Sequence, residues 1–153
     1  MLFRSGKPAS TSQLVDKISL FKARQQAEYH RFLDESKACI QRMVDGFHHQ
    51  DLEKIKRAIR YNRDLLKQLG NNSGVDIETP VLHQLCQIAE RFGGAAKTSG
   101  AGGGDCGIVA IDHQADFRGV LKSWAKNHIE QLPLNVHFIA DVKRQVQERL
   151  PLK

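Results

Sequence analysis

The stretch AAKTSGAGGGDCGIVAI, residues 95–111, marks the point where the pattern of the chain changes from helical to extended. Residues 106–111 form a compact run rich in β-branched side chains, which is typical of a buried strand. Residues 95–99 predict a short strand, and four of the six residues from 100 to 105 are glycine. We therefore expect a glycine-rich loop between two strands.

The residues before this stretch predict helices. Apolar side chains recur mostly at helical spacing over 12–46, which predicts one long helix that ends near Gly46. Asp51 predicts the N-cap of a second helix, which Gly70 is expected to close. The Thr-Pro pair at 79–80 places a cap before a proline at the first helical position, so a third helix is expected from there to residue 92.

The residues after the stretch predict one more helix and one more strand. Asp112 or His113 is expected to start the helix, which carries Trp124 in its apolar stripe and therefore in the core. Alternating apolar and polar residues predict a half-buried strand over 134–138, and 142–150 form a charged tail with helical character. Helices followed by strand, loop, strand, helix and strand indicate an α+β fold with an antiparallel sheet.

The composition fits a globular protein of one domain. The 153 residues suffice for a sizeable core, and the longest apolar run, 108–111, is far too short to cross a bilayer. No secretory leader is predicted, and the three cysteines form no C-x-x-C pair, so a reducing cytoplasm is the expected location. The net charge of +6 suits an anionic partner such as a phosphate ester, a nucleotide or a nucleic acid, and equally a solvated basic surface.

The glycine loop differs from three known phosphate-binding loops. A P-loop places its lysine after the glycines, whereas Lys97 and Thr98 precede them here. Gly102, Gly104 and Gly107 match the letters of the dinucleotide fingerprint, but a strand follows them instead of a helix. A protein-kinase glycine loop requires a lysine on the next strand and an H-R-D motif, and the sequence contains neither.

The chemistry of the loop nevertheless favours an anion. Glycines allow positive φ and the close approach of a ligand, so successive backbone N–H groups can surround a phosphate. Lys97 adds a positive charge, and Thr98 and Ser99 add hydrogen-bond donors. A hairpin without a ligand fits the composition as well, since glycine-rich turns are common.

The amino-acid sequence of the loop and its surroundings resembles that of a known family. GGAAKTSGAGGGDCGIVA (93–110), preceded by ETPVLHQLCQIAERF (78–92), is similar to the third conserved motif of the GHMP kinases. The resemblance is fullest to the phosphomevalonate kinases of that group, whose Gly-x-Pro-Ala-Ser-Thr stretch is similar to 6–11. Residues 132–138, LPLNVHF, resemble their last strand.

This resemblance implies a GHMP-kinase C-terminal domain, with a ferredoxin-like antiparallel sheet packed against long helices. It covers nearly the whole chain from residue 6 and starts where the C-terminal lobe of these enzymes starts. We therefore expect one domain over 1–153, with the ATP-binding N-terminal lobe outside it and residues 1–5 foreign to the family pattern. The chain alone is expected to be inactive, because phosphoryl transfer needs both lobes.

The resemblance also implies a reaction and a site. These kinases transfer the γ-phosphoryl group of ATP, bound with Mg²⁺, to 5-phosphomevalonate in the mevalonate pathway of isoprenoid biosynthesis. By the resemblance, the substrate faces Ser99, Gly100 and Ala101. The loop residues implied to lie near the phosphates are Lys97, Thr98, Gly102, Gly103, Gly104 and Asp105. Asp105 either braces the loop or forms a simple turn. No catalytic residue and no metal ligand is implied in this chain, and ATP is expected to be held mainly by the other lobe.

Two alternative functions stay open: the C-terminal lobe of another GHMP kinase, such as a mevalonate kinase, and a basic nucleic-acid-binding module. The second predicted helix carries the basic residues Lys54, Lys56, Arg57, Arg60 and Arg63, for which a solvated face is expected. His48 and His49 are expected at the surface, because adjacent residues on a helix point in different directions. Cys106 is expected to be a small buried residue.

Overall fold

The computed structural model describes residues 2–4, 11–100, 102–103 and 106–133. The helices within these residues are α1 (Thr11–Arg24), α2 (Gln26–His48), α3 (Leu52–Ser73), α4 (Pro80–Arg91) and α5 (Phe117–Ala125). The strands are β1 (Leu2–Arg4), β2 (Ala95–Thr98), β3 (Cys106–Ala110) and β4 (Glu130–Gln131). In the part of the chain that the structure describes, none of the helices is both long and apolar enough to traverse a membrane.

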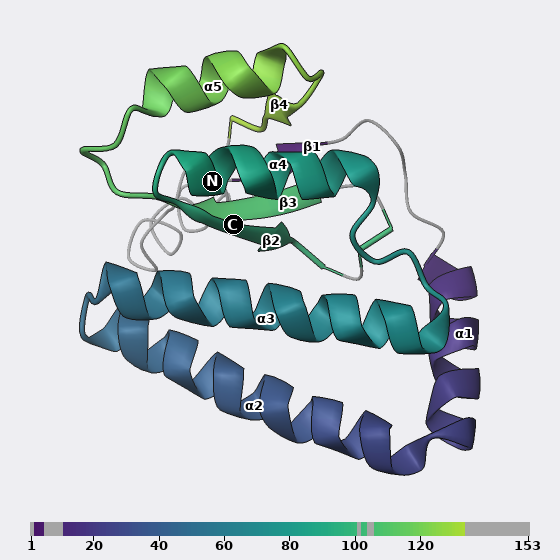
Figure 1. The fold of residues 1–153 in the computed structure, drawn as a ribbon. Coiled ribbons are helices and arrows are strands. Elements are labelled where there is room, and N and C mark those ends of the chain that lie inside the picture. Colours follow the sequence, from purple (N-terminus) through teal and green to yellow (C-terminus); the bar gives the residue numbers. More distant parts are fainter. Residues whose placement is uncertain (1, 5–10, 101, 104–105, 134–153) are drawn as a thin grey trace, which may run out of the picture.

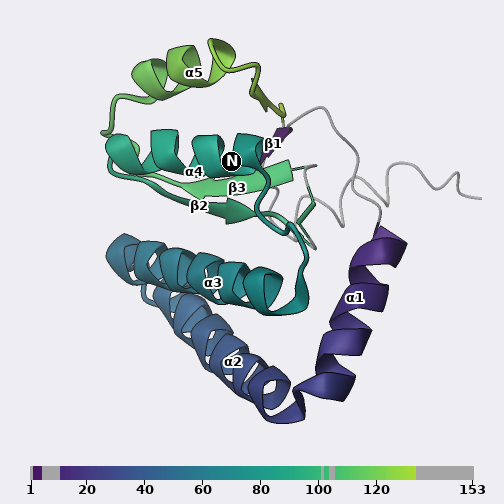
Figure 2. The same ribbon diagram turned by 45° about the vertical axis from the view of Figure 1, so that its right-hand side comes forward.

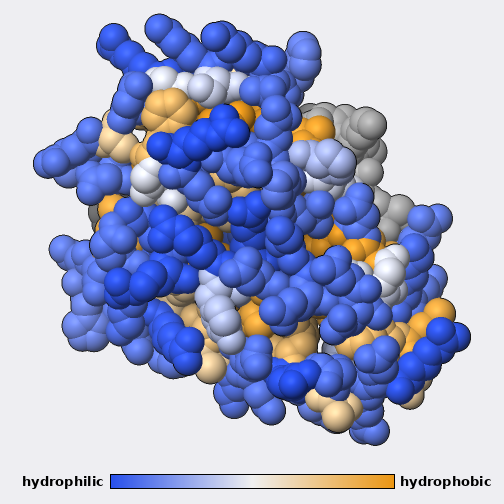
Figure 3. Space-filling view, in the orientation of Figure 1, coloured by the Kyte–Doolittle hydropathy of each residue, from blue (hydrophilic) through white to orange (hydrophobic). Residues whose placement is uncertain are grey.

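The elements form layers (Figure 1). Helices α4 and α5 cover one face of the sheet, and α3 covers the other face, with α2 beyond it. Helix α1 stands across the ends of α2 and α3, at a steep angle to both (Figure 2). On the face seen in Figure 3 the surface is mostly hydrophilic, and hydrophobic residues show as separate small patches. The predicted α+β class is confirmed.

The sheet has the strand order β2-β3-β1-β4, and every neighbouring pair is antiparallel. Strands β2 and β3 form the predicted hairpin, with Ala95 opposite Ala110 and Thr98 opposite Gly107. Both strands end one residue earlier than predicted. Strand β1 lies between β3 and β4 and was not predicted, whereas the strand predicted over 134–138 lies outside the described residues.

Two apolar clusters sandwich the sheet, because successive strand residues point to opposite faces. Ala95 packs against Ile55 and Ile59 of α3. Its neighbour Ala96 belongs to a cluster on the other face, which consists of buried residues from α4, α5, the segment after α5 and both hairpin strands: Leu85, Cys86, Ile88, Ala89, Ala96, Val109, Val120, Trp124 and Ile129. Alanines on β2 let helices approach the sheet closely on both sides.

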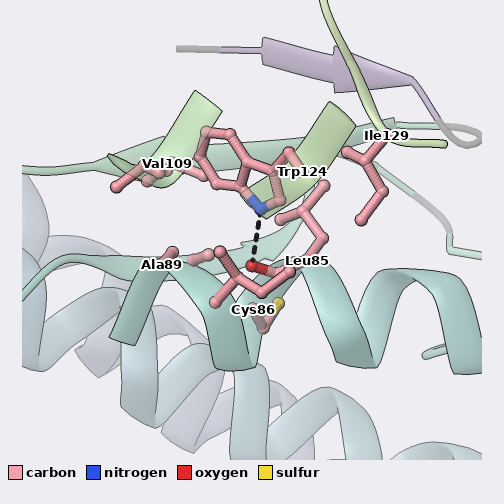
Figure 4. Close-up of a cluster of buried hydrophobic side chains, with 9 residues drawn as sticks. Leu85, Cys86, Ala89, Val109, Trp124 and Ile129 are labelled. Carbon is pink, nitrogen blue, oxygen red and sulfur yellow. Dashed lines mark hydrogen bonds between the residues drawn. The ribbon is translucent and has the colours of Figure 1, made fainter. Parts of the chain in front are cut away.

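Trp124 lies at the centre of the second cluster (Figure 4). Its side chain is 1% exposed, and its indole Nε1 donates a hydrogen bond to the backbone oxygen of Leu85, at 3.2 Å. A buried indole requires such a partner, since an unpaired donor in an apolar environment is costly. The predicted core role of Trp124 is confirmed.

The first predicted helix is wrong in one respect, because residues 12–46 do not form a single helix. The chain leaves the helical conformation at Gln25, where φ is −133° and ψ is 60°. This break lets the rings of Phe21 and Tyr29 meet edge to face, with their centroids 6.4 Å apart. Phe21 is thereby buried against the end of α3, so tertiary packing overrides the helical propensity of the residues around Gln25.

The second predicted helix begins as expected but ends later. The carboxylate of Asp51 accepts a hydrogen bond from the backbone N–H of Lys54, at 2.8 Å, which confirms the predicted cap. Gly70 lies inside α3, and Gly74, with φ of +67°, is the left-handed residue that ends the helix. A Cβ on Gly70 would lie 2.7 Å from the backbone oxygen of Val75, so this glycine is required for close packing rather than for termination.

The last predicted helix begins later than expected. Asp116, not Asp112 or His113, is its cap: the Asp116 carboxylate accepts a hydrogen bond from the N–H of Gly119, at 2.9 Å. Asp112 accepts instead from the N–H of Gln114, at 2.8 Å, and so forms a turn before the helix. Both aspartates satisfy the sequence rule for a cap, and only the packing of α5 on α4 selects between them.

Candidate functional site

The glycine loop leaves the sheet at Ser99. The backbone N–H of Ser99 donates to the oxygen of Cys106, at 2.9 Å, and thus adds one step to the β2–β3 ladder. The hydroxyl of Thr98 donates to the oxygen of Gly100, at 3.3 Å. Ser99 and Gly100 are exposed, and a Cβ on Gly100 would meet no atom within 4 Å. The entrance of the loop is therefore open to a ligand.

The return of the loop is held tightly against another part of the backbone. Gly102 and Gly103 have φ of +84° and +80°, a conformation that favours glycine. The N–H of Gly103 donates to the backbone oxygen of Ile77, at 3.0 Å. A Cβ on Gly102 would lie only 2.4 Å from that same oxygen. Both the conformation and the lack of space thus require glycine at 102.

Ile77 belongs to the segment that joins α3 to α4, residues 74–79, which we call the connector. Its side chains Val75 and Ile77 are 6% and 5% exposed and pack against α1 and α3. Thr79 ends the connector as the N-cap of α4, and its hydroxyl accepts a hydrogen bond from the N–H of Leu82, at 3.4 Å. The cap predicted at 79–80 is confirmed. The glycine loop therefore rests on a segment fixed at both ends.

A cavity of about 240 Å³ lies beside the loop. It is lined by residues of α1, the connector and the loop: Gln13, Leu14, Lys17, Val75, Asp76, Thr79 and Gly103. The ammonium group of Lys17 donates to the backbone oxygen of Gly74, at 3.1 Å. The volume is below the roughly 300–1,000 Å³ of pockets that enclose a whole small molecule, so the cavity suits one end of a ligand.

Lys97 lies at the base of the loop on the face of β2 that Ala95 shares. Its side chain is buried, and its Nζ donates to the backbone oxygen of Thr98, at 2.6 Å. Burial lowers the pKa of Lys97 below its ordinary value, and the nearby thiols of Cys86 and Cys39 oppose that effect only in part. The predicted contact of this lysine with a phosphate stays a prediction.

The structure brings together Ser99, Gly100, Gly102 and Gly103 of the predicted site residues, while Ala101, Gly104 and Asp105 lie outside the described residues. It adds a residue that the sequence analysis missed, Ile77, which acts through its backbone oxygen. A carbonyl group is common to all residues, so no side-chain signal marks Ile77 in the sequence. Thr79 was noted as a helix cap but not as a cavity residue.

The connector is also held by a buried ion pair. Arg63 of α3 donates from Nε and Nη2 to the two carboxylate oxygens of Glu78, at 2.6 and 2.7 Å. Their side chains are 10% and 6% exposed. Burial alone would raise the pKa of Glu78, but hydrogen bonds from Arg63 and His83 and the charges of Arg63 and Lys67 hold it below its ordinary value. The carboxylate is therefore ionised at neutral pH.

The basic cluster of α3 does not form the solvated face that was predicted. As whole residues, Lys56 and Arg63 are each only 8% exposed. The Lys56 ammonium donates to the oxygen of Gly93, at 3.0 Å, and Arg60 Nη2 donates to the oxygen of Gly94, at 2.9 Å. These carbonyls follow the C-terminus of α4, where positive charge is favourable. Part of the basic charge of α3 thus binds backbone oxygens within the fold rather than facing solvent.

Two smaller predictions have different outcomes. His48 and His49 are exposed, as expected. Cys106 is half-buried rather than buried, because it is the first residue of β3 and borders the loop. Cys86 is fully buried, and burial raises the pKa of its thiol to about 12, so it is unreactive. Among the described residues, no group of three or more His, Cys, Asp or Glu side chains could hold a metal ion.

Comparison with known proteins relates this site to a family. Residues 43–130 match the family described as "GHMP kinases C terminal". The phosphomevalonate kinase of Streptomyces sp. (strain CL190) is 39% identical over 132 residues, which cover 85% of this chain and 35% of that enzyme.

Two solved structures share the fold. A Lin0012 protein from Listeria innocua has a TM-score of 0.85 and 36% identity, over 90% of this chain and 39% of that one. Streptococcus pneumoniae phosphomevalonate kinase in complex with phosphomevalonate and AMPPNP has a TM-score of 0.71 and 32% identity, over 86% of this chain and 38% of that one. The chain thus spans 35–39% of the length of these relatives.

Proposed function

The chain belongs to the GHMP kinase family, whose C-terminal domain it carries, and from this premise we propose that it is the acceptor-orienting lobe of a phosphomevalonate kinase. The proposed reaction moves the γ-phosphoryl group of ATP to 5-phosphomevalonate and yields ADP and 5-diphosphomevalonate, in the mevalonate pathway of isoprenoid biosynthesis. One observation carries the proposal: the glycine loop, open at its entrance and fixed at its return, in a chain 39% identical to a phosphomevalonate kinase.

The loop would contribute by positioning the acceptor. Phosphoryl transfer depends mainly on alignment of the reacting groups and stabilisation of charge, so a rigid loop beside the substrate is useful without any proton transfer. The N–H of Ser99 is already bonded to Cys106, so Ser99 would contact the substrate through its hydroxyl and Gly100 through its N–H. The proposed contacts of Ala101 complete the substrate-binding set.

The rest of the loop would carry the backbone past the transferring phosphate. The tight path of Gly102 and Gly103 supports this role, and the same role is proposed for Gly104, with Asp105 as a brace. The adjoining cavity, with Lys17 and Thr79 in its wall, would take one end of the bound molecule. Lys97 would supply positive potential at the base of the loop.

The partners of the reaction are ATP with Mg²⁺ and 5-phosphomevalonate. When bound, the metal ion would neutralise charge that develops on the ATP phosphates. None of the described residues is assigned to it, and ATP would be held mainly by the other lobe of the kinase. The buried thiols of Cys39 and Cys86 fit a reducing compartment, so we place the kinase in the cytoplasm.

A steady-state assay of the full-length kinase that carries this lobe tests the function. We expect ADP release with 5-phosphomevalonate and none with mevalonate. ADP release with mevalonate would instead identify a mevalonate kinase. Ser99→Ala should lower kcat/KM for phosphomevalonate by about fivefold, the equivalent of one hydrogen bond of about 1 kcal/mol, and should leave the KM for ATP unchanged. Ser19→Ala, on the exposed surface of α1, is the matched control. An unchanged kcat/KM in Ser99→Ala would contradict the assignment.

The 153-residue chain provides a separate test. By itself it should release no ADP, because the parts that hold ATP are proposed to lie elsewhere in the kinase. Its Gly100 amide should nevertheless shift in an NMR titration with phosphomevalonate. ADP release by the purified chain, above the level of a Lys97→Ala and Ser99→Ala double variant, would show that the division of labour proposed between the lobes is wrong.

A further inference from the structure

The connector fixes the glycine loop through its backbone. The hydrogen bond from the Gly103 N–H to the Ile77 oxygen, at 3.0 Å, joins the two segments, and Gly102 lies directly against the same residue. Any shift of Ile77 would therefore displace the return of the loop. The loop can be no better ordered than the connector on which it rests.

The next residue, Glu78, fixes the connector to α3. Glu78 accepts two parallel hydrogen bonds from the guanidinium group of Arg63, and this bidentate arrangement fixes both distance and orientation. Glu78 also lies 2.7 Å from His83 Nδ1 and 4.0 Å from Lys67 Nζ. Three positively charged or hydrogen-bonding groups thus converge on one buried carboxylate.

Arg63 holds a second carboxylate, which provides an internal comparison. Its Nη1 donates to Glu90 of α4, at 2.7 Å. The Glu90 side chain is 36% exposed, whereas that of Glu78 is 6% exposed. Glu90 lies near the far end of α4 from the connector, so the loss of its charge should leave Ile77 in place. Substitution of Glu78 and of Glu90 can therefore distinguish an effect of Arg63 on the position of the loop from an effect of Arg63 on the stability of the whole domain.

We propose that Arg63 and Glu78 are positioning residues for the phosphoryl-transfer loop, and that they act through the Ile77 oxygen and the Gly103 N–H. The effect on catalysis rests on the proposed kinase function, but the mechanical link does not. Neither residue touches the glycine loop in the contacts described, so both act only through the connector. Their role is to keep the loop in one conformation before the substrate binds, which preserves the alignment that transfer requires.

Hydrogen exchange tests the mechanical link in the full 153-residue chain. Glu78→Gln keeps the shape of the side chain and removes its charge. We expect the Gly103 amide to exchange about tenfold faster in this variant, while the amides of Ala96 and Val109 in the sheet keep their wild-type rates. Glu90→Gln, the matched control on the same arginine, should leave the Gly103 rate unchanged. If Glu78→Gln does not fold, Arg63→Lys replaces it, since lysine keeps the charge and loses the bidentate geometry.

The outcomes are distinct. Unchanged Gly103 exchange in a folded Glu78→Gln or Arg63→Lys variant would overturn the proposal, and so would an equal acceleration in Glu90→Gln. In the full-length kinase, Glu78→Gln should lower kcat/KM for phosphomevalonate about tenfold and leave the KM for ATP unchanged, whereas Glu90→Gln should change neither. If exchange responds as expected and the wild-type enzyme does not use phosphomevalonate, the proposed function fails and the mechanical link stands.

Discussion

The cluster around Trp124 covers one face of the β2–β3 hairpin, the glycine loop joins the two strands of that hairpin, and the two regions are held in opposite ways. The cluster is built from large side chains that fill space, with one hydrogen bond to satisfy the indole. The loop return is built from glycines. A backbone hydrogen bond holds it to the connector, and Gly102 can lie against Ile77 only because it has no Cβ. The first arrangement supplies stability and tolerates changes of shape, whereas the second supplies position and tolerates no added atom.

The largest expected effect on stability is at Trp124. Trp124→Ala should lower the free energy of unfolding by about 3–5 kcal/mol, because it removes a large buried side chain and leaves a cavity. Denaturant unfolding followed by circular dichroism measures this loss. Leu121→Ala, a partly buried neighbour on α5, should cost clearly less. Equal losses in the two variants would contradict the central place given to Trp124.

Gly102→Ala tests the glycine loop, the other region of the comparison. It forces a Cβ into a space 2.4 Å from the Ile77 oxygen and a side chain onto a φ of +84°, at a cost of about 1–3 kcal/mol. The stability loss should therefore be smaller than in Trp124→Ala. In the proposed full-length kinase, however, kcat/KM should fall by about 100-fold, because displaced loop atoms would no longer align the proposed acceptor.

Gly93→Ala is the control for that variant. Gly93 follows α4, outside the connector and the glycine loop; it also has a positive φ, of +80°, but a Cβ there would meet no atom within 4 Å. This substitution should cost about 1 kcal/mol of stability through conformation alone and should leave kcat/KM nearly unchanged. A similar loss of activity in both variants would mean that the contact of Gly102 with Ile77 has no special importance.

The smallest expected effect is a dependence of stability on pH. The folded protein holds the pKa of Glu78 below its ordinary value, so the unfolded chain binds more protons as acid is added. The stabilisation is fully present above the unfolded pKa of about 4.3 and is lost as pH falls through the lower folded pKa. Thermal unfolding between pH 7 and pH 3 should show a smaller acid-induced loss in Glu78→Gln. Parallel curves would rule out Glu78 as a contributor.

Local chemistry explains which parts of the fold could be predicted from the sequence. Asp51 and Thr79 were correctly identified as caps because the side chain of a cap bonds to the backbone only three residues away. The hairpin was correctly placed because glycines separate two runs of different composition. Such signals depend on a few neighbouring residues, so they can be recognised without knowledge of how the rest of the chain folds.

The errors arose where distant segments meet. The break at Gln25 is set by the burial of Phe21 against the end of α3, and Gly70 stays helical because the connector lies against it. The candidate site shows the same division. The loop could be predicted from its glycines, but its support could not, because Ile77 contributes a carbonyl and Glu78 is paired with a residue fifteen positions away.

The buried position of Lys97 has a consequence for the behaviour of the protein in a crowded solution. In the sheet as described, β2 is the last strand on its side, and an outermost strand is a ready template for strands of other chains. All four residues of β2 are covered by helices, and one of them is an inward-pointing lysine. A foreign strand that docked here would disturb this charge in its apolar surroundings, so we expect Lys97 to oppose aggregation through this sheet edge.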